Sequence, residues 1–385
     1  MKTANVAEAV KSEHAVALLK QMYGENRVEE NAARYQLVAD GFAKEFGDKA
    51  FEFFSAPGRT EIGGNHTDHN HGKVLAGSVH LDCVAAAAPN GTHTVNLISE
   101  TYNQHLVINL DDLAPTEKTT GTEPLLKGIF AGLLEKGCKV EGFDAYVTSN
   151  VIGGAGVSSS ASFEMLVCAI TNYFFNEGKL EYGEYARAGQ YAENVYWKKA
   201  SGLMDQMASS TGNLVHIDFA NPENPQVEKI DFDMEKYGYR LCITDTKGSH
   251  ADLTDEYAAV PKEMKLVAKY FGKEVLRDIS INDVLDNITD LRKKFGDRCV
   301  LRALHFIYEN KRVQKEVSAL KAGNIGAFLD DVKASGNSSF KYLQNVYSNQ
   351  DIKNQNVSLA LFVSEMFLGQ NGVCRVHGGG FAGTI

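Results

Sequence analysis

The sequence predicts an α+β protein built from two domains. The chain has 385 residues, and compact domains usually hold about 100–200 residues each. Strand-like apolar runs alternate with helical patterns in the first half, whereas helical spacing dominates the second half. The loop Asn221–Pro225 marks a shift in composition soon after Gly212. We therefore expect an N-terminal domain over residues 1–212 and a C-terminal domain over residues 213–385.

Composition and charge argue against several classes of protein. The net charge of −10 at pH 7 disfavours a nucleic-acid partner, which requires a basic surface. No run approaches the roughly 20 apolar residues that cross a bilayer, and the N-terminus lacks the apolar core of a signal peptide. The six cysteines lie far apart without a C-x-x-C motif, as free thiols do in a reducing compartment. We expect a cytoplasmic protein without a membrane partner, present as a monomer or a weak homo-oligomer.

The first part of the chain is predicted to begin with helices and to continue with strands. Helical spacing covers residues 1–48. The patterns then predict, in chain order, a strand at Lys49–Ala56 ended by a turn at Pro57–Gly58, a strand pair within Lys73–Ala88, a hairpin turn at Pro89–Gly91 into a strand at His93–Ser99, a strand at Gln104–Leu110 and a helix at Leu125–Lys136.

The most informative stretch is FDAYVTSNVIGGAGVSSSASFEMLVCAITNYFF, Phe143–Phe175. Its β-branched and aromatic residues predict a strand over Phe143–Val151, its glycines a tight turn, and its serines and apolar residues a buried helix from Ser158 onward. Ser158 or Ser159 is expected to cap this helix by accepting a backbone N–H. Free N–H groups and the positive end of the helix dipole make such a start an anion site, usually for phosphate. A purely structural turn capped by serines is the alternative.

Two common phosphate loops do not fit this stretch. A Walker A loop requires Lys after its last glycine, but Val157 and three serines follow Gly156. A dinucleotide fingerprint requires a third glycine where Ser159 stands. The stretch therefore predicts a phosphate loop of another kind.

A second polar stretch, GRTEIGGNHTDHNHGKVLAGSV at Gly58–Val79, is dense in hydrogen-bonding side chains. They are Arg59, Glu61, Asn65, His66, Asp68, His69, Asn70 and His71. Such a loop between strands favours a binding site over a solvated turn. Its planar donors and acceptors suit a molecule with several hydroxyl groups, and a metal site built from its histidines and Asp68 is the alternative.

Two acids stand out in the segment that follows the serine-rich helix. Glu193 lies between apolar neighbours on a helix predicted over Tyr182–Lys198. Asp205 lies in the small, apolar and weakly charged stretch Ala200–Gly212. Since a buried carboxylate needs a partner or a function, Asp205 is a candidate functional residue. Glu193 is a candidate too, with an ordinary surface carboxylate as the alternative.

The remainder of the chain is predicted to be mainly helical. The patterns predict strands at Leu214–Phe219 and Tyr239–Thr244, a polar loop at Asp245–His250, helices at Pro261–Tyr270, Arg298–Leu320 and Ala327–Leu343, and a last strand before Gly378–Gly383. A returning strand is expected after this glycine turn, so we expect the native chain to continue past Ile385.

Four motifs, in this order, resemble those of the galactokinases. GRTEIGGNHTDHNHG resembles the galactokinase pattern G-R-x-N-x-I-G-E-H-x-D-Y-N-x-G. VIGGAGVSSSASFE resembles the glycine-serine loop of the GHMP superfamily, named for galactokinase, homoserine kinase, mevalonate kinase and phosphomevalonate kinase. AENVYWKKASGLMDQ is similar to A-E-H/N-x-F-x-G-x-x-C-G-I-M-D-Q, and RVHGGGFAGTI to the third motif R-M-T-G-G-G-F-G-G. One glycine motif is weak, but several ordered motifs with kept spacing, covering roughly residue 50 to the end, are strong.

This resemblance implies a fold and an activity. The fold would be the two-domain GHMP kinase fold, with a ribosomal-protein-S5-like N-terminal α/β domain, a ferredoxin-like C-terminal α/β domain and the active site between them. The activity would be transfer of the γ-phosphoryl group of ATP to the anomeric hydroxyl of galactose, with Mg²⁺ as the metal ion. The partners would be a small sugar and ATP.

The resemblance also implies roles for individual residues. The ATP phosphates would be bound by Gly153, Gly154, Ala155, Gly156, Val157, Ser158, Ser159 and Ser160. The Mg²⁺ ion would be held by Ser160 and Glu193. The sugar would be contacted by Arg59, Asn65, His66, Asp68, Gly202, Asp205 and Tyr257. Asp205 would act as general base beside Arg59, and the loop over the site would be formed by Gly378, Gly379 and Gly380.

Departures from the family patterns leave the sugar open. Asn65 stands where the family has a sugar-binding Glu, and Glu61 where it has Asn. His69 replaces a Tyr, and His377 replaces a Thr. An amide can donate where a carboxylate only accepts, so galacturonate, arabinose and N-acetylgalactosamine are alternatives to galactose. A non-catalytic sugar sensor on the same fold and a metal-dependent hydrolase using the histidine cluster are two further classes, but the retained acid and serine groups favour the kinase.

Overall fold

The computed structural model describes residues 2–151, 153, 156–199, 201–248, 253–381 and 383–385. They form two compact units. The first unit comprises Met1–Arg59, Ser78–Gly153 and Val157–Thr211, and the second comprises Thr60–Gly77, Gly154–Gly156 and Gly212–Ile385. The last change of unit falls where the sequence predicts the domain boundary, but the polar loop of residues 60–77 belongs to the second unit. The assignment of domains 1–212 and 213–385 stays a prediction.

The first unit combines a sheet with helices. Its helices are α1 (Val6–Ala9), α2 (Glu13–Tyr23), α3 (Val28–Phe46), α4 (Thr122–Glu135), α5 (Ser159–Phe175), α6 (Tyr182–Tyr191) and α7 (Met204–Thr211). Its strands are β3 (Thr94–Ser99), β4 (Gln104–Asn109) and β5 (Phe143–Ser149), together with parts of the long strands β1 (Glu52–Gly63) and β2 (Lys73–Pro89). The predicted helices within residues 1–48 and the predicted strand–loop–helix at Phe143–Phe175 are confirmed.

The strand order in the first unit is β4-β3-β5-β2, and β1 also pairs with β2. β3 is antiparallel to β4 and parallel to β5, and β5 is antiparallel to β2. The predicted hairpin between β2 and β3 is therefore wrong, because β5 lies between them. The backbone of Gly142, just before β5, bonds to the turn between β2 and β3. Its N–H donates to Thr92 O at 2.8 Å, and its carbonyl accepts from Asn90 N–H at 3.1 Å.

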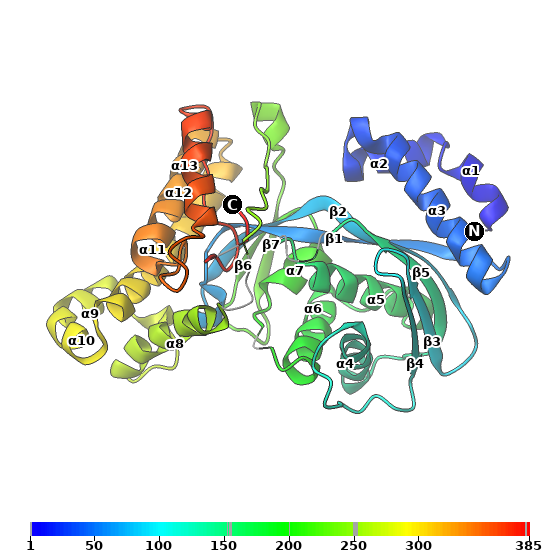
Figure 1. Cartoon of the computed structure of the whole chain (residues 1–385), viewed down its shortest axis with the longest axis horizontal. Helices are drawn as coiled ribbons and strands as arrows, with labels where there is room; N and C mark the ends of the chain where they lie inside the picture. The colour runs from blue at the N-terminus through cyan, green and yellow to red at the C-terminus, as the bar shows by residue number, and fades with distance from the viewer. Residues whose placement is uncertain (1, 152, 154–155, 200, 249–252, 382) are drawn as a thin grey trace. The chain divides into compact units, whose positions relative to one another are not determined.

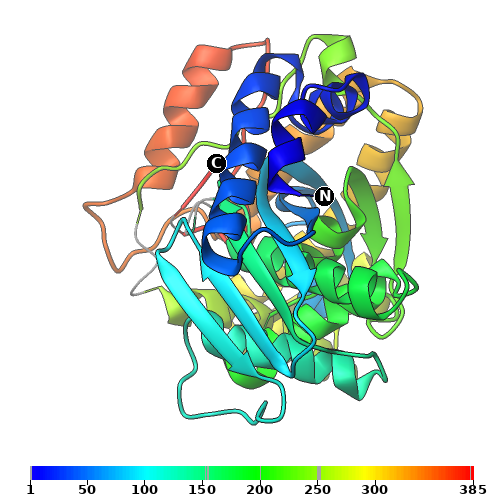
Figure 2. The same ribbon diagram turned by 90° about the vertical axis from the view of Figure 1, so that its right-hand side faces the viewer.

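The part of β2 in the first unit is buried on both faces. Successive side chains of a strand point to opposite faces, so Cys83, Ala85 and Ala87 join the core under α4, α5 and α6, while Val84, Ala86 and Ala88 face α3. Figures 1 and 2 show α3 on one face of this sheet, and Figure 1 shows α4, α5 and α6 on the other. Burial on both faces explains the unbroken run of small apolar residues at this position.

The strands that flank the polar loop are longer than predicted. β1 continues through Pro57 and Gly58 instead of turning there, and Lys73–Pro89 is one strand instead of a pair. Among the described strands β1 pairs with β2 alone, and a proline is tolerated on such an edge strand because its missing N–H is not needed for pairing. A Cβ on Gly58 would lie 2.7 Å from the carbonyl oxygen of Val157, so glycine permits this close approach.

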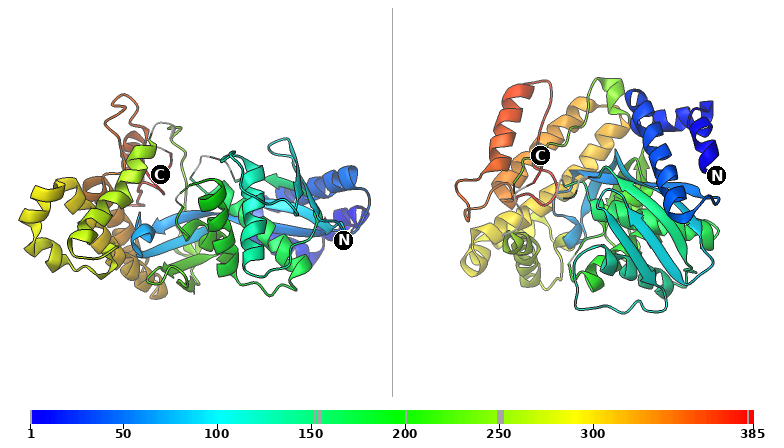
Figure 3. Two further views of the ribbon diagram at one scale, coloured as in Figure 1. Left: turned by 90° about the horizontal axis from the view of Figure 1, so that it is seen from below. Right: turned by 45° about the vertical axis from the view of Figure 1, so that its right-hand side comes forward.

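The second unit is mainly helical. Its helices are α8 (Thr254–Tyr270), α9 (Ile281–Asp286), α10 (Ile288–Phe295), α11 (Asp297–Lys321), α12 (Ile325–Ser338) and α13 (Asn356–Leu368), and its further strands are β6 (Leu214–Asp218) and β7 (Gln226–Ile230). β6 pairs antiparallel with the start of β2 and with β7. α11 packs against α8, α10 and α12, and Figure 3 shows α8, α9 and α10 gathered together. One apolar core lies around α8 and α11, and another between α11, α12 and the strands.

Two predictions in the second unit are wrong. Tyr239–Thr244 and the residues before Gly378 are not regular strands; one isolated bridge joins Asp245 and Thr384. Strand propensity does not supply the neighbouring strand that a ladder requires. The helix predicted from Pro261 begins earlier, at Thr254, and carries Pro261 inside it. Proline is common at helix starts, but here the apolar face of α8 already includes Leu253 and Tyr257.

The described helices do not include one whose length and apolar character would span a lipid bilayer. The six cysteines are free, as predicted, and four of them are buried.

Candidate active site

Three neighbouring helical segments of the first unit bring the predicted serine and acidic residues together. Ser160 lies in the first turn of α5, and Asp205 lies in the first turn of α7. Glu193 lies in η4, a π-helical turn over Ala192–Tyr196 that directly follows α6. α5, α6 and α7 pack against one another, as Figure 1 shows. Single π-helical turns within helices are frequent at functional sites.

Arg59 and Asp205 form a two-pronged ion pair. Arg59 Nε lies 2.7 Å from Asp205 Oδ1, and Nη2 lies 2.8 Å from Oδ2. The arginine side chain is 8% exposed and the aspartate side chain 32% exposed, so the carboxylate keeps an accessible side. The Arg59 backbone is tied to the glycine loop, because its N–H donates to Val157 O at 3.0 Å. The structure therefore places the predicted catalytic pair next to the predicted phosphate loop.

Asp205 is held in its ionised form. Burial by itself would raise the pKa of this carboxyl group, but the charge and hydrogen bonds of Arg59 outweigh burial. The hydroxyl of Ser158 and the charge of Lys199 add to this effect, and the pKa of Asp205 lies below its ordinary value. Asp205 is thus an ionised hydrogen-bond acceptor at neutral pH.

The predicted cap of α5 by Ser158 is wrong. Ser158 has φ +56° and ψ +66°, a left-handed conformation, and its side chain does not cap the helix. N-cap side chains reach the first-turn N–H groups from an extended backbone. The Ser158 hydroxyl instead donates to Asp205 Oδ2. The N–H groups of Ser159 and Ser160, in the first turn of α5, are left for another acceptor, as at any helix start without a cap.

The other residues of the predicted phosphate loop are only partly described. Gly153 is exposed, Val157 is buried, and Gly156 has a left-handed backbone with φ +72°. A Cβ on Gly156 would lie 3.1 Å from His377 Nδ1, within the second unit. Gly154 and Ala155 lie outside the described residues.

Glu193 is buried and surrounded by donors. Its side chain is 3% exposed, so the alternative of a surface carboxylate is wrong. Ser160 Oγ donates to Glu193 Oε1 at 2.8 Å, and the hydroxyl of Ser201 donates to Oε2. Lys199 Nζ contacts both carboxylate oxygens, at 2.9 and 3.0 Å. Gly202, a predicted sugar contact, follows Ser201 and precedes α7 by one residue.

Lys199 and Ser201 are functional candidates that the sequence analysis missed. Ser201 stands at the cysteine position of the galactokinase pattern A-E-H/N-x-F-x-G-x-x-C-G-I-M-D-Q, which could have drawn attention to it. Lys199 stands at a position that the pattern leaves free, so no signal in the sequence marks it. Both become visible only because the chain between η4 and α7 turns back to Glu193.

Within the second unit, the structure brings the polar loop of residues 60–77 together with the glycine turn Gly378–Gly380. The carbonyl oxygens of the glycine turn accept hydrogen bonds from several side chains. Asn65 Nδ2 lies 2.6 Å from Gly378 O, His66 Nε2 lies 2.9 Å from Gly379 O, and the Tyr257 hydroxyl lies 2.6 Å from Gly380 O. The ring of Tyr257 also occupies the space that a Cβ on Gly379 would need. Packing by these side chains defines the conformation of the glycine turn.

Asn65 is fully buried, and both ends of its amide are used within the protein. The Nδ2 group donates to Glu61 Oε1 at 2.9 Å and to Gly378 O, and Oδ1 accepts from Asn345 Nδ2 at 2.8 Å. A sugar contact by Asn65 stays a prediction. In the structure the Asn65 side chain links the glycine turn at Gly378 to Glu61 through hydrogen bonds.

Glu61 and Arg375 form a buried ion pair that the sequence analysis did not predict. Their side chains are 5% and 7% exposed. Arg375 Nη2 contacts Glu61 Oε1, Nη1 lies 2.6 Å from Ile62 O, and Nε lies 2.9 Å from Val376 O. Beside them, His377 Nε2 lies 3.1 Å from Thr60 Oγ1. These contacts join the first motif to the chain before the glycine turn.

The histidine and aspartate side chains of the polar loop do not gather around a common point. His66 uses Nε2 on Gly379 O, and Asp68 Oδ1 accepts from the His69 N–H at 2.9 Å in the short helix η3 (Asp68–Asn70). Among the described residues, no group of three or more His, Cys, Asp or Glu is arranged to hold a metal ion.

His66 is expected to make the free energy of unfolding depend on pH. Burial of the imidazole lowers the pKa of His66 to about 4, despite the hydrogen bond to Gly379. The unfolded histidine has a pKa of 6.5, so between these values the unfolded state binds a proton that the folded state excludes. The free energy of unfolding is therefore expected to fall as the pH decreases through this window.

This expectation is checked by urea unfolding of the wild-type protein and of His66→Gln at about pH 7 and about pH 5. The variant should lose less stability than the wild type over this interval, because one partly buried titrating group is gone. His93→Gln is the matched control, because His93 is 71% exposed. An identical loss in wild type and His66→Gln would contradict the expectation.

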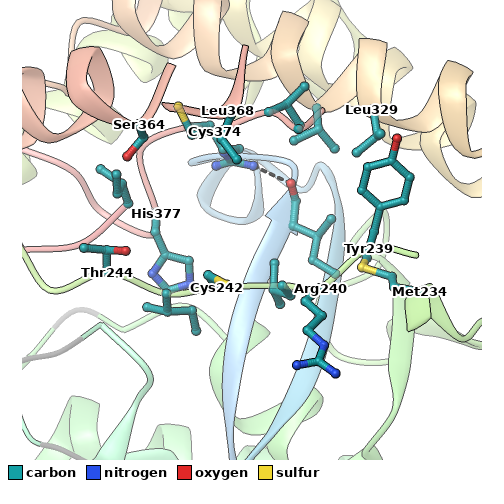
Figure 4. A pocket seen from close by; sticks show the side chains of 18 of the residues that line it. Met234, Tyr239, Arg240, Cys242, Thr244, Leu329, Ser364, Leu368, Cys374 and His377 are labelled. Carbon is teal, nitrogen blue, oxygen red and sulfur yellow. Dashed lines mark hydrogen bonds between the residues drawn. The ribbon is translucent and has the colours of Figure 1, made fainter. Parts of the chain in front are cut away.

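The second unit also contains an apolar cavity of about 610 Å³. Figure 4 shows Met234 and Leu329 on one side of it and Thr244 and His377 on the other. Leu368 and other side chains of α12 and α13 also line it, together with residues 60–62, 238–243 and 371–376. The described residues that line it include none of the predicted site residues, and an apolar wall does not suit a sugar or a phosphate group. The cavity is thus distinct from the candidate active site.

Comparisons with known proteins identify the relatives of this chain. The family model described as "Galactokinase galactose-binding signature" matches residues 40–89, and "GHMP kinases N terminal domain" matches residues 124–213. A galactokinase of Streptomyces coelicolor is 32% identical over 311 residues, covering 79% of this chain and 79% of that protein. A galactokinase of Actinobacillus pleuropneumoniae is 26% identical over 352 residues, covering 91% of this chain and 88% of that protein.

Solved structures agree with these relatives. The structure of Lactococcus lactis galactokinase complexed with galactose has a TM-score of 0.78 and 25% sequence identity, and the match covers 91% of this chain and 89% of that one. A mevalonate kinase has a TM-score of 0.58 at 16% identity, which is a likeness of fold alone. The predicted GHMP kinase fold is confirmed. Because the ordered motifs, the family models and a relative above 30% identity over most of the chain agree, this chain belongs to the galactokinase family.

Proposed function

We propose that this protein is a galactose 1-kinase, which transfers the γ-phosphoryl group of ATP to the anomeric hydroxyl of galactose. The products are galactose 1-phosphate and ADP. The observation that carries the proposal is the bidentate pair of Arg59 and Asp205, which Ser158 links to the start of α5. A structural relative, Lactococcus lactis galactokinase, was solved with galactose, and this supports galactose as the sugar.

In this proposal the start of α5 binds the nucleotide phosphates. The N–H groups in the first turn of α5 are unused by the helix itself and lie at the positive end of its dipole. The chain as a whole is acidic, so these N–H groups and the local cations must attract the phosphates. The roles of Gly153, Gly156 and Ser159 follow from this position in the fold.

Asp205 and Arg59 then act on the sugar hydroxyl. The ionised Asp205 accepts a hydrogen bond from the anomeric O–H, orients its oxygen toward the γ-phosphorus, and takes the proton as the new O–P bond forms and the bond to ADP breaks. Arg59 keeps Asp205 ionised and stabilises the charge on the transferred group. Positioning and charge stabilisation supply most of the lowering of the barrier in such transfers.

Ser160 and Glu193 fit a Mg²⁺ ion. This ion takes oxygen ligands and is commonly bound by one or two carboxylates together with substrate phosphates. The buried Glu193 carboxylate lies beside the Ser160 hydroxyl at the start of α5, and a cation, Lys199, already faces it. Ser160 and Glu193 would hold the ion, which would supply positive charge against the charge that develops on the phosphates during transfer.

The sugar contacts of the proposal come from the polar loop after β1, from the segment before α7 and from α8. They are Asn65, His66, Asp68, Gly202 and Tyr257, with Gly378, Gly379 and Gly380 as the loop that closes over the site. The six free thiols suit the reducing cytoplasm, and we place the enzyme there as a monomer or a weak homo-oligomer.

A second candidate is a kinase for a related sugar. The observation that favours it is the complete use of the Asn65 amide inside the protein, at the position where the family has a sugar-binding Glu. Galacturonate and arabinose differ from galactose at C6, and N-acetylgalactosamine differs from it at C2. A non-catalytic sensor of galactose and ATP is the remaining candidate.

The deciding experiment measures ADP release by the purified protein with ATP, Mg²⁺ and each of these four sugars. We expect the highest kcat/KM for galactose. A higher value for another sugar would support the second candidate, and binding of galactose without ADP release would support the sensor. Failure to bind or phosphorylate any of the four would contradict the proposal.

A further inference from the structure

Lys199 is a cation of the first unit for which neither the family pattern nor the proposed mechanism has a role. Its ammonium nitrogen lies 2.9 Å from Oε1 and 3.0 Å from Oε2 of Glu193. The Glu193 side chain is 3% exposed, whereas the Lys199 side chain is 57% exposed. The carboxylate is thus fixed in the interior, while its cation reaches it from the solvent side.

A second buried carboxyl group, that of Glu164, lies near Glu193. Burial, followed by the charge of Glu193, raises the pKa of the buried Glu164 well above its ordinary value. Gln206 donates to Glu164 at 3.2 Å, and the guanidinium of Arg59 is engaged by Asp205. Lys199 pairs directly with both oxygens of Glu193, and a buried carboxylate is costly without such a partner.

Lys199 also lies next to the proposed phosphate site. Glu193 accepts from Ser160, the second residue of α5, on one side and from Lys199 on the other. An anion at the start of α5 would be a neighbour of this carboxylate and would come within reach of the same lysine side chain. Glu193 thus contacts both the first turn of α5 and the ammonium group of Lys199.

We propose that Lys199 is a movable countercharge of the nucleotide site. In the nucleotide-free protein its ammonium group neutralises Glu193. When Glu193 exchanges this partner for a divalent cation, the ammonium group moves to phosphate oxygens of the bound nucleotide. This inference rests on the proposed kinase function, and it adds Lys199 to the residues that bind the nucleotide.

The chemistry of the side chain suits this role. Lysine carries a compact point charge on a flexible stem, with three donors that can be redirected, and it is a common phosphate ligand. Arg59 differs in each respect, since its planar group is 8% exposed and fixed by two hydrogen bonds to Asp205. The Arg59 guanidinium is therefore held in one position, whereas the Lys199 ammonium group can change its partner.

The first test measures binding of a divalent cation without nucleotide, with Mn²⁺ as the probe and the electron paramagnetic resonance signal of the free ion as the readout. In Lys199→Met the competitor on Glu193 is absent, so Mn²⁺ is expected to bind about 10-fold more tightly than in the wild type. Lys198→Met is the matched control, because Lys198 is the exposed neighbouring lysine and loses the same charge. It should change the affinity by less than about 2-fold.

The second test measures binding of Mg²⁺·ADP by calorimetry in the absence of sugar. Lys199→Met is expected to weaken it about 10-fold, because one charged hydrogen bond to phosphate is lost. Lys198→Met should bind as the wild type does. Opposite effects of one substitution on metal and nucleotide binding would show that the Lys199 charge acts on both ligands; the measurement of lysine reactivity that follows tests whether the side chain moves.

A third measurement needs no variant. Acetylation by acetic anhydride is followed at Lys199 and Lys198 of the wild-type protein by mass spectrometry, with Lys198 as internal standard. We expect Lys199 to react faster when Mn²⁺ is added and slower again when ADP follows. Equal reactivity in all states, or wild-type affinities in Lys199→Met, would overturn the inference. Failure of the wild type to bind Mg²⁺·ADP would instead contradict the proposed function.

Discussion

Asp205→Asn is expected to lower kcat by about 10²–10⁴-fold, the range for a positioned general base. The amide retains the size of the carboxylate and can still accept a hydrogen bond from Arg59. It cannot take the proton of the sugar hydroxyl, and it removes the negative charge that orients that hydroxyl. KM for the sugar should change little, because its other contacts remain. The measurement is the rate of ADP release at saturating ATP and galactose.

The matched control for this prediction is Asp144→Asn. Asp144 lies in β5, paired with Lys49 and hydrogen-bonded by Asn90 and Asn96, and takes no part in the candidate site. Its substitution should affect thermal stability and leave kcat near the wild-type value. Turnover of Asp205→Asn within a few-fold of the wild type would remove Asp205 from the proposed role, provided that the variant is folded and binds ADP.

Local patterns were sufficient to predict the centre of the site. The strand, glycine turn and serine-rich helix at Phe143–Phe175 are confirmed, because each depends on residues close in sequence. The choice of Asp205 as a candidate also followed from local composition, since an acid in an apolar stretch needs a partner. The identity of that partner, Arg59, came only from the resemblance to a family, because the two residues are far apart in the chain.

Local patterns failed where a distant segment decides the structure. The turn at Pro89–Gly91 has the composition of a hairpin, but β5 lies between the two strands. Pro57–Gly58 has the composition of a turn, but pairing with β2 keeps β1 extended. Ser158 has the composition of a helix cap, but the carboxylate of Asp205 attracts its hydroxyl. In each case a long-range contact outweighs a local preference.

The buried contacts of the second unit show why two departures from the family pattern occur together. Glu61 stands where the pattern has Asn, and Asn65 stands where it has Glu. An amide at position 65 can donate to Glu61 and to Gly378 O, which a carboxylate cannot do because it only accepts. Two carboxylates at these positions would also repel each other. Positions 61 and 65 together thus still hold one acid and one amide, and Arg375 neutralises the acid at position 61.

Arg375→Met is expected to lower the free energy of unfolding by about 3–5 kcal/mol, the range for removing one partner of a buried ion pair. The substitution leaves Glu61 buried without its countercharge, and it leaves the carbonyl oxygens of Ile62 and Val376 without a guanidinium donor. Urea unfolding followed by circular dichroism measures the effect. The matched control is Arg292→Met, which breaks the Arg292–Asp297 pair, 59% and 66% exposed, and should cost less than about 1 kcal/mol.

The reason for the expected difference is solvation. Water replaces the lost partner of Asp297, whereas the 5% exposed Glu61 has no such replacement and must stay charged in the interior or take up a proton. Glu61→Gln combined with Arg375→Met removes both charges, so this double variant should be more stable than Arg375→Met alone. Equal destabilisation by Arg375→Met and Arg292→Met, or a double variant less stable than Arg375→Met, would show that the pair does not join the first motif to the glycine turn through its charges.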